Sequence, residues 1–361
     1  MIFRNILLLV AAFFIVQTAF AGSVNAQQPT PTPTDRKKTD KDKKTDKSDA
    51  EKDDEPTEPR QRTQDGRIDA GSIPSISSSS DKRYRFEVGI LPRFNSNLFE
   101  AEDDATKVSS FITTLSGKAE YDFVRNDKRT FTGSVQVRHN IYKDVENANS
   151  TDIDVTMHYK SDKNDFQATY FATPERLAFI TGNNLYVHSN IQGGNFDYTR
   201  RLSKRFRASA AYQITRENYE GAAFDDRNNI RHRLIGEARY RVDYLFQPGI
   251  GFEYERVKAD SENYNRSGYA PILLVVSSYK DIIYTSARYR FIRRDYATGN
   301  PLLANFDRRD YRHDFSLYSV VKIARQWHIY GFINALDNNS SRLGRSFTGY
   351  QSGLGLFFQF P

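Results

Sequence analysis

Apolar and polar residues alternate along the chain after its first quarter. Tyr84, Phe86, Val88 and Ile90 occupy every second position, and charged residues or glycine lie between them. A period of two is typical of a β-strand with two unlike faces. The run at 111–123 keeps the alternation for longer than the ~5–6 residues of a common soluble strand. The pattern therefore predicts an all-β domain built from long strands.

The same rule predicts fourteen strands. We expect them near residues 83–90, 111–123, 131–141, 150–160, 165–173, 184–199, 205–217, 230–243, 247–257, 268–277, 282–294, 309–322, 326–336 and 347–360. The strand at 268–277 is the least regular because Pro271 interrupts it, and proline inside a strand normally marks an edge. The pair Gly193-Gly194, where the apolar phase shifts, predicts a β-bulge.

Short and long connections alternate between these strands. Short polar turns are predicted at 124–129, 161–165 and 199–204, and long polar loops at 95–108, 220–229 and 295–308. This asymmetry is typical of a transmembrane antiparallel up-and-down β-barrel, whose even strand number places both ends in the periplasm. Lipid cannot satisfy a free strand edge, so the sheet must close on itself. About fourteen strands should enclose a water-filled bore of moderate width unless a loop fills it.

Two segments of different character precede the predicted barrel at 83–361. Residues 1–26 have the layout of a secretory signal peptide, with Arg4, an apolar stretch and small-residue cleavage patterns ending at Ala21 and Ala26. Residues 27–82 are rich in Pro, Thr, Lys, Asp and Ser and contain no aromatic residue. Such a segment cannot bury enough apolar surface to offset the entropy of ordering, so we expect a disordered periplasmic linker.

Composition narrows the class of protein further. The chain has no cysteine, which excludes disulfides, thiolate metal sites and a cysteine nucleophile. After the N-terminus it has no apolar run of ~18 residues, which excludes a helical span in the mature protein. It is rich in aromatic residues, with 22 Tyr and 26 Phe, and its formal net charge is +7. The basic residues are spread over the strands and form no single patch, so nucleic acid is not an expected partner.

The last strand, GYQSGLGLFFQFP, carries Tyr350, Leu354, Leu356, Phe358 and Phe360 on one face. This resembles the C-terminal strand of Gram-negative outer-membrane β-barrel proteins, which commonly ends in an aromatic residue and is recognised by the outer-membrane assembly machinery. Here Pro361 follows the aromatic residue. The opening segment EVGILPRFNSNLFE is similar to a group of β-barrel porins, some of which accompany exopolysaccharide export. The resemblance implies a location in the outer membrane.

The polar faces of the strands supply the candidate functional residues. In the predicted registers the following charged side chains point toward the lumen: Arg85, Glu87, Lys118, Glu120, Asp122, Arg138, Glu237, Arg239, Arg241, Glu253, Glu255, Arg288, Arg290, Arg312 and Asp314. Rings of charged side chains set the selectivity of pores. The alternative is that Arg and Glu neighbours on adjacent strands only neutralise each other.

No catalytic, cofactor or metal site is expected. The best candidate for a catalytic pair, His188-Ser189, lies on a predicted strand, where consecutive side chains point to opposite faces. His139 and His313 fall on the lipid-facing side. The acidic segment 101–105 could bind calcium, but a solvated acidic loop is the expected explanation.

The leading hypothesis is a porin-like, non-enzymatic channel for hydrophilic solutes or a secreted polysaccharide. The alternative is a barrel without an open pore that anchors an envelope assembly, with 27–82 contacting a periplasmic or cell-wall partner. An outer-membrane hydrolase is the outsider. Under all three hypotheses the barrel is expected to contact outer-membrane lipid.

Overall fold

The computed structural model describes residues 82–98, 108–126, 128–180, 185–243, 245–279, 282–297, 305–342 and 345–360. The predicted signal peptide lies outside the described residues, as do the acidic segment 101–105 and the predicted linker except for Lys82. No helix in the described ranges is long and apolar enough to cross a membrane.

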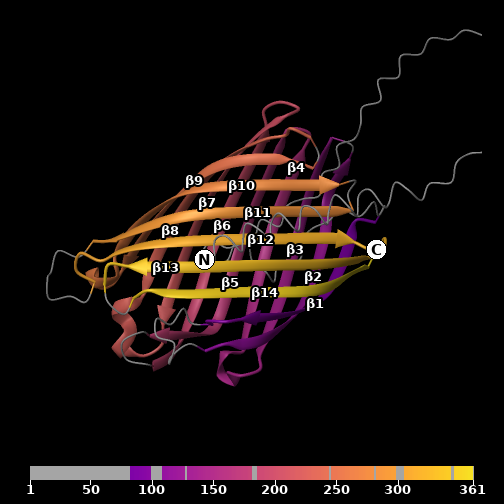
Figure 1. Ribbon diagram of the computed structural model, residues 1–361. Helices are drawn as coiled ribbons and strands as arrows, with labels where there is room; N and C mark the ends of the chain where they lie inside the picture. The colour runs from indigo at the N-terminus through magenta and orange to yellow at the C-terminus, as the bar shows by residue number, and fades with distance from the viewer. Residues whose placement is uncertain are drawn as a thin grey trace, which may run out of the picture. The chain divides into compact units, whose positions relative to one another are not determined.

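Fourteen antiparallel strands form one closed barrel, which confirms the predicted fold class (Figure 1). The strands are β1 (Tyr84–Asn95), β2 (Ser110–Asn126), β3 (Arg129–Tyr142), β4 (Ser150–Ser161), β5 (Asn164–Ile180), β6 (Leu185–Arg201), β7 (Phe206–Tyr219), β8 (Asn229–Tyr240), β9 (Gln247–Ala259), β10 (Arg266–Tyr279), β11 (Ile283–Tyr296), β12 (Arg309–Lys322), β13 (Trp327–Ser340) and β14 (Phe347–Phe360). Each strand pairs with its sequence neighbours, and β1 pairs with β14 to close the ring.

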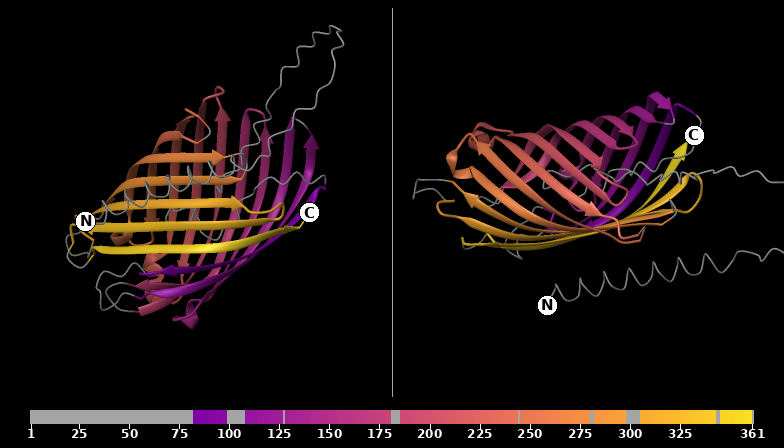
Figure 2. Two further views of the ribbon diagram at one scale, coloured as in Figure 1. Left: turned by 45° about the vertical axis from the view of Figure 1, so that its right-hand side comes forward. Right: turned by 90° about the horizontal axis from the view of Figure 1, so that it is seen from above.

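The connections at the two rims differ as expected. Short turns join β2 to β3, β10 to β11 and β12 to β13, and the longest connections follow the odd-numbered strands β1, β7 and β11. The connection between β5 and β6 is the exception, because it is as short as the turn between β12 and β13. Three of the longer connections contain a short 3-10 helix: η2 (Glu146–Ala148), η3 (Ala222–Arg227) and η4 (Glu262–Tyr264). Figure 2 shows the strands running obliquely between the two rims, as the tilt of a closed barrel requires. We refer below to the short-turn rim and the long-loop rim.

Side chains alternate between an apolar outer face and a polar inner face. On β1, Phe86 and Ile90 are exposed on the outside, whereas Glu87 between them is only 7% exposed. The same contrast recurs on β9 between Ile250, 66% exposed, and Glu253, 3% exposed. An exposed band of aromatic and aliphatic residues around a closed sheet is typical of a barrel that faces lipid.

Two local predictions had different outcomes. Pro271 lies within β10, at a point where the pairing with β11 skips from Tyr269 to Ile272 while the pairing with β9 continues. Proline has no backbone N–H to donate, and Pro271 therefore lies where the hydrogen-bond ladder between β10 and β11 is interrupted. The bulge predicted at Gly193-Gly194 is wrong, because β6 keeps its register with both neighbours there. The irregularity lies on the facing strand β5, between Thr173 and Arg176.

The seam between β1 and β14 depends on a glycine. Gly89 lies directly opposite Phe357, and a Cβ atom added at Gly89 would overlap the Phe357 ring. Gly117 on β2 is the contrasting case, since an added Cβ there meets nothing within 4 Å. An aromatic ring that covers a cross-strand glycine is a known device for fixing strand register.

Replacing Gly89 by alanine should weaken the closing seam. Overpacking of a filled site costs about 1–3 kcal/mol, so we expect Gly89→Ala to lower the urea midpoint of unfolding in detergent micelles. Gly117→Ala makes the same chemical change in open space and should leave the midpoint unchanged. Equal midpoints for the two variants would show that the Phe357 ring moves aside without cost.

Candidate functional site

The charged residues assigned to the inner face are withdrawn from solvent in the structure. Those that are buried are Glu87, Lys118, Asp122, Arg138, Arg239, Glu253, Glu255, Arg290, Arg312 and Asp314. Those that are half-buried are Arg85, Glu120, Glu237, Arg241 and Arg288. A buried charge is costly unless ion pairs and hydrogen bonds compensate it, so the arrangement of partners decides what these groups can do.

One group of charges connects β1 and β2. Arg85 donates from Nη1 to Asp122 Oδ2 at 2.8 Å and from Nε to Glu120 Oε2 at 3.2 Å. Lys118 Nζ lies 2.6 Å from Glu120 Oε1. Thr132 on β3 donates to the other oxygen of Asp122 at 2.8 Å. Four of the predicted residues thus form one network on neighbouring strands.

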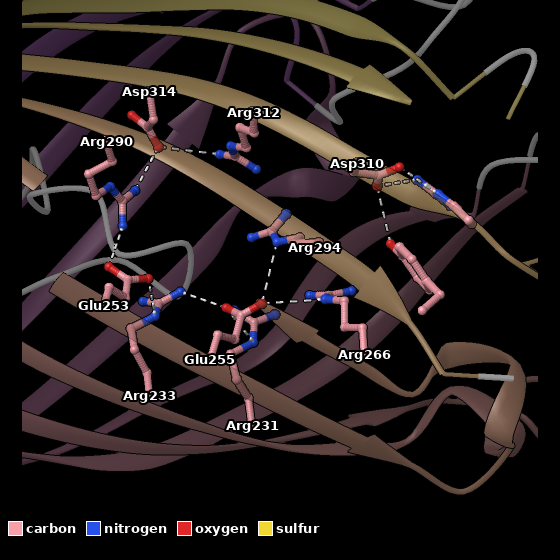
Figure 3. A network of polar contacts seen from close by, with 12 residues as sticks. Arg231, Arg233, Glu253, Glu255, Arg266, Arg290, Arg294, Asp310, Arg312 and Asp314 are labelled. Carbon is pink, nitrogen blue, oxygen red and sulfur yellow. Dashed lines mark hydrogen bonds and ion pairs between the residues drawn. The ribbon is translucent and has the colours of Figure 1, made fainter. Parts of the chain in front are cut away.

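A larger network lies on β8 to β12, toward the long-loop rim, and Glu255 is its centre (Figure 3). The Glu255 side chain is 3% exposed, and its carboxylate is surrounded by arginines from three strands. Oε2 lies 3.1 Å from Arg233 Nη2, and Oε1 lies 3.4 Å from both Arg266 Nε and Arg294 Nε. Arg231 Nε completes the set at 3.9 Å from Oε2.

Arg290 extends this network across the next strands. It is 1% exposed and donates from Nη1 to Glu253 on β9 at 3.0 Å and from Nη2 to Asp314 on β12 at 2.6 Å. Arg312 approaches the same Asp314 oxygen at 3.6 Å. The ion pairs of this network join six arginines to three carboxylates, so this part of the inner face is basic.

One ion pair crosses two intervening strands. Arg288 Nη2 on β11 lies 2.8 Å from Glu237 Oε1 on β8, although β9 and β10 lie between these strands in the sheet. The two side chains therefore meet over the concave inner surface. A contact of this kind reduces the open cross-section of the barrel interior.

An apolar cluster occupies the part of the inner face nearer the short turns. Tyr284, Val320 and Tyr330 are direct cross-strand neighbours on β11, β12 and β13, and all three are buried. The Tyr330 ring packs against those of Tyr318 and Phe357, with both centroid distances 6.2 Å. The remaining members of the cluster are Leu91, Ala211, Ile235, Ile272, Leu274, Val276 and Phe332. The inner face thus has a charged part and an aromatic part.

Several members of the networks were missing from the sequence-based assignment. Arg231 and Arg233 share the odd-numbered face of β8 with Glu237, and Arg294 shares the even-numbered face of β11 with Arg290. The same alternation, followed to the strand ends, would have identified them. Asp154, which lies 2.8 Å from Arg138, could have been found in the same way.

The candidate catalytic pair His188-Ser189 is not brought together in the structure. Ser189 is fully buried and donates to Glu217 Oε1 at 3.3 Å, whereas His188 on the opposite face lies near the Glu175 carbonyl. His139 is exposed, and His313 accepts or donates at 2.7 Å with the Tyr289 hydroxyl. Among the described residues no group of three or more potential ligands could hold a metal ion.

The chain is similar to several solved outer-membrane proteins. OmpT of Vibrio cholerae has a TM-score of 0.43 at 9% identity, covering 79% of this chain and 100% of that one. The toluene transporter TodX of P. putida has a TM-score of 0.41 at 8% identity, covering 78% and 91%. An anion-selective porin from Comamonas acidovorans has a TM-score of 0.37 at 10% identity, covering 77% and 98%. These likenesses are too distant to indicate what this chain does.

None of the curated proteins matches the chain. A family model does: residues 115–339, more than half of the chain, match the model described as surface lipoprotein assembly modifier. The match runs from β2 to β13 and so covers the larger charged network, the smaller one except Arg85, and most of the apolar cluster. This chain is a β-barrel protein of the bacterial outer membrane and belongs to the surface lipoprotein assembly modifier family.

Proposed function

We propose that this barrel assists the placement of lipoproteins at the cell surface and does not serve as a general diffusion pore. The observation that carries the proposal is the family match over residues 115–339, because it spans most of the barrel wall and the larger interior network. In this role the barrel is a non-enzymatic membrane component whose partners are outer-membrane lipid, the assembly machinery that inserts it, and a lipoprotein. Residues 27–82 would supply a periplasmic contact.

The inner face supports a barrel that is closed at rest. A pore for free diffusion needs a water-filled bore lined by accessible polar groups. Here Arg233, Arg290 and Arg312 are each 1% exposed and are engaged in ion pairs. We therefore assign those predicted inward residues that form ion pairs to the mutual neutralisation that was the alternative to a selectivity filter.

A porin-like channel for hydrophilic solutes or a secreted polysaccharide is the second candidate. The observation that favours it is the excess of arginine over carboxylate among the residues in Figure 3, which would attract anions if the networks opened. The two candidates differ in the resting conductance that they predict.

Planar bilayers and whole cells together test the proposal. Purified wild-type protein should give few or no stable conductance steps. A deletion strain should lose one or more palmitate-labelled lipoproteins from the set reached by a membrane-impermeant biotin reagent, and the plasmid-borne gene should restore them. Total lipoprotein abundance serves as the control. An unchanged set of surface lipoproteins, together with regular open-channel steps, would contradict the proposal and favour the porin-like channel.

A further inference from the structure

The outer face of the barrel carries a basic cluster near the long-loop rim. We define the outer basic cluster as Arg216 on β7, His232 on β8, and Arg256 and Lys258 on β9. Arg216, Arg256 and Lys258 are exposed, and His232 is half-exposed. All four occupy the even-numbered, outward positions of their strands, alongside the exposed residues Tyr212, Leu234 and Tyr254.

The register brings these four side chains together. His232 lies directly opposite Arg256. Arg216 and Lys258 both lie opposite Ile230, one from each side, so they are two strand spacings apart, or about 10 Å. The cluster therefore forms a compact group on three adjacent strands, with a spread that suits two anionic groups on one small headgroup.

Tyrosines fix the depth of the cluster in the membrane. One row of cross-strand neighbours on the outer face carries four tyrosines that are each 37–43% exposed. They are Tyr212 on β7, Tyr254 on β9, Tyr269 on β10 and Tyr311 on β12. Exposed tyrosines gather where the apolar core of a membrane meets the headgroups. The outer basic cluster begins two residues beyond this row, toward the long loops, with His232 and Arg256, and continues to Arg216 and Lys258 four residues beyond it. By the loop asymmetry of outer-membrane barrels, that rim faces the outer leaflet.

The cations of the cluster are available to a ligand. Within the described residues, Arg256 and Lys258 have no ion-pair partner, and Arg216 donates only to the Asn218 side chain, at 3.1 Å. The acidic residues next to them in sequence, Glu217 and Glu255, point inward and are buried. Asp260 follows the last residue of β9, and the exposed carboxylates Glu220, Asp225 and Asp226 lie in the adjacent connection between β7 and β8. Within the described residues none of these four carboxylates forms an ion pair with Arg216, Arg256 or Lys258.

The far side of the same rim differs. The outward positions at the long-loop ends of β13 and β14 carry Asp337, Asn339, Thr348 and Tyr350, none of them basic. On β11 and β12 the outward cations Arg293 and Arg309 form ion pairs with Asp295 and Asp307. Among β7 to β14, the exposed cations at this depth that form no ion pair within the described residues are therefore those on β7 and β9.

We propose that the outer basic cluster binds the phosphate groups of a phosphorylated glycolipid of the outer leaflet. Arginine and lysine at headgroup depth form charge-assisted hydrogen bonds with phosphate oxygens. The tyrosine row beneath them would contact the sugar and the upper acyl chains. Such a lipid would hold β7 to β9 in a fixed position next to the internal network, because Glu255 and Arg256 are consecutive residues of the same strand.

Native mass spectrometry of the full chain in detergent tests the site, with purified diphosphoryl lipid A as the probe. The test variant is Arg216→Gln, Arg256→Gln and Lys258→Gln combined. The matched control removes three exposed cations near the short-turn rim by Arg200→Gln, Lys204→Gln and Arg205→Gln. Heat-modifiable migration on a gel confirms that both are folded. We expect the wild type and the control to retain one lipid A, and the test variant to bind it at least tenfold more weakly.

Two results would overturn the proposal. One is equal retention of lipid A by the test variant and the control. The other is full displacement of lipid A by inorganic pyrophosphate, which would assign the cluster to free phosphate anions instead of a membrane lipid. Lipid A without its phosphates should bind wild type and test variant equally weakly, and strong binding of that lipid would also contradict a phosphate site.

Discussion

Replacing Glu255 by glutamine is expected to destabilise the barrel by about 3–5 kcal/mol, the range for removing one partner from a buried ion pair. The substitution keeps the shape of the side chain but removes the negative charge that lies within 4 Å of Arg231, Arg233, Arg266 and Arg294. Four arginines would then share a buried site without their central anion. The urea midpoint of unfolding in detergent micelles measures the loss.

The same variant should also conduct. Uncompensated arginines repel one another, so the network should loosen, and planar bilayers should show anion-selective steps that the wild type lacks. Glu220→Gln removes an exposed carboxylate beyond the end of β7 and is the control. Adding Arg233→Gln to Glu255→Gln should recover part of the stability, since the two groups are coupled. Equal stability of Glu255→Gln and Glu220→Gln would show that the network contributes nothing to the fold.

The second large effect is expected from Tyr330→Ala. Tyr330 is fully buried among the rings of Tyr318, Phe332 and Phe357. Removal of a buried aromatic ring costs about 3–5 kcal/mol, because contacts are lost and a cavity remains. The cavity would lie in the apolar part of the inner face, so the variant should unfold at lower urea and admit small solutes, as liposome swelling would show.

Tyr350→Ala is the matched control for this variant. Tyr350 is 53% exposed on the outer face of β14, so its removal leaves no interior cavity. If Tyr330→Ala swells liposomes no faster than Tyr350→Ala, the apolar cluster does not restrict the passage of solutes.

The fold could be predicted from the sequence because alternation, loop length and closure are local or topological properties. Parity alone places Glu253 and Arg290 on the inner face, and the structure buries both. Alternation also predicts the strand that contains Pro271. It does not reveal that the pairing is interrupted at Pro271 toward β11 and continues toward β9. The bulge was wrongly predicted at Gly193 because its cause lies on the facing strand. The Phe171 ring of β5 covers that glycine, and the register irregularity is on β5.

The partners of the inner charges could not be predicted in the same way. A period of two assigns a face but gives no distance between strands that are not neighbours in the sheet. Arg288 and Glu237 meet across two intervening strands, and that contact depends on the curvature of the closed wall. The apolar cluster was missed for a related reason: Tyr284, Tyr318 and Tyr330 stand at inward positions, where alternation leads one to expect polar residues.

The seam between β1 and β14 has a consequence for the order of folding. Every other strand pairing in the described barrel joins consecutive strands and can form as a hairpin, whereas Phe86 must find Phe360 across almost the whole barrel sequence. Contacts between distant parts of a chain form slowly, because ordering the loop between them costs entropy first. Closure should therefore be the last event of biogenesis. Once the seam has formed, the packing of the Phe357 ring over Gly89 would slow the reopening of the barrel.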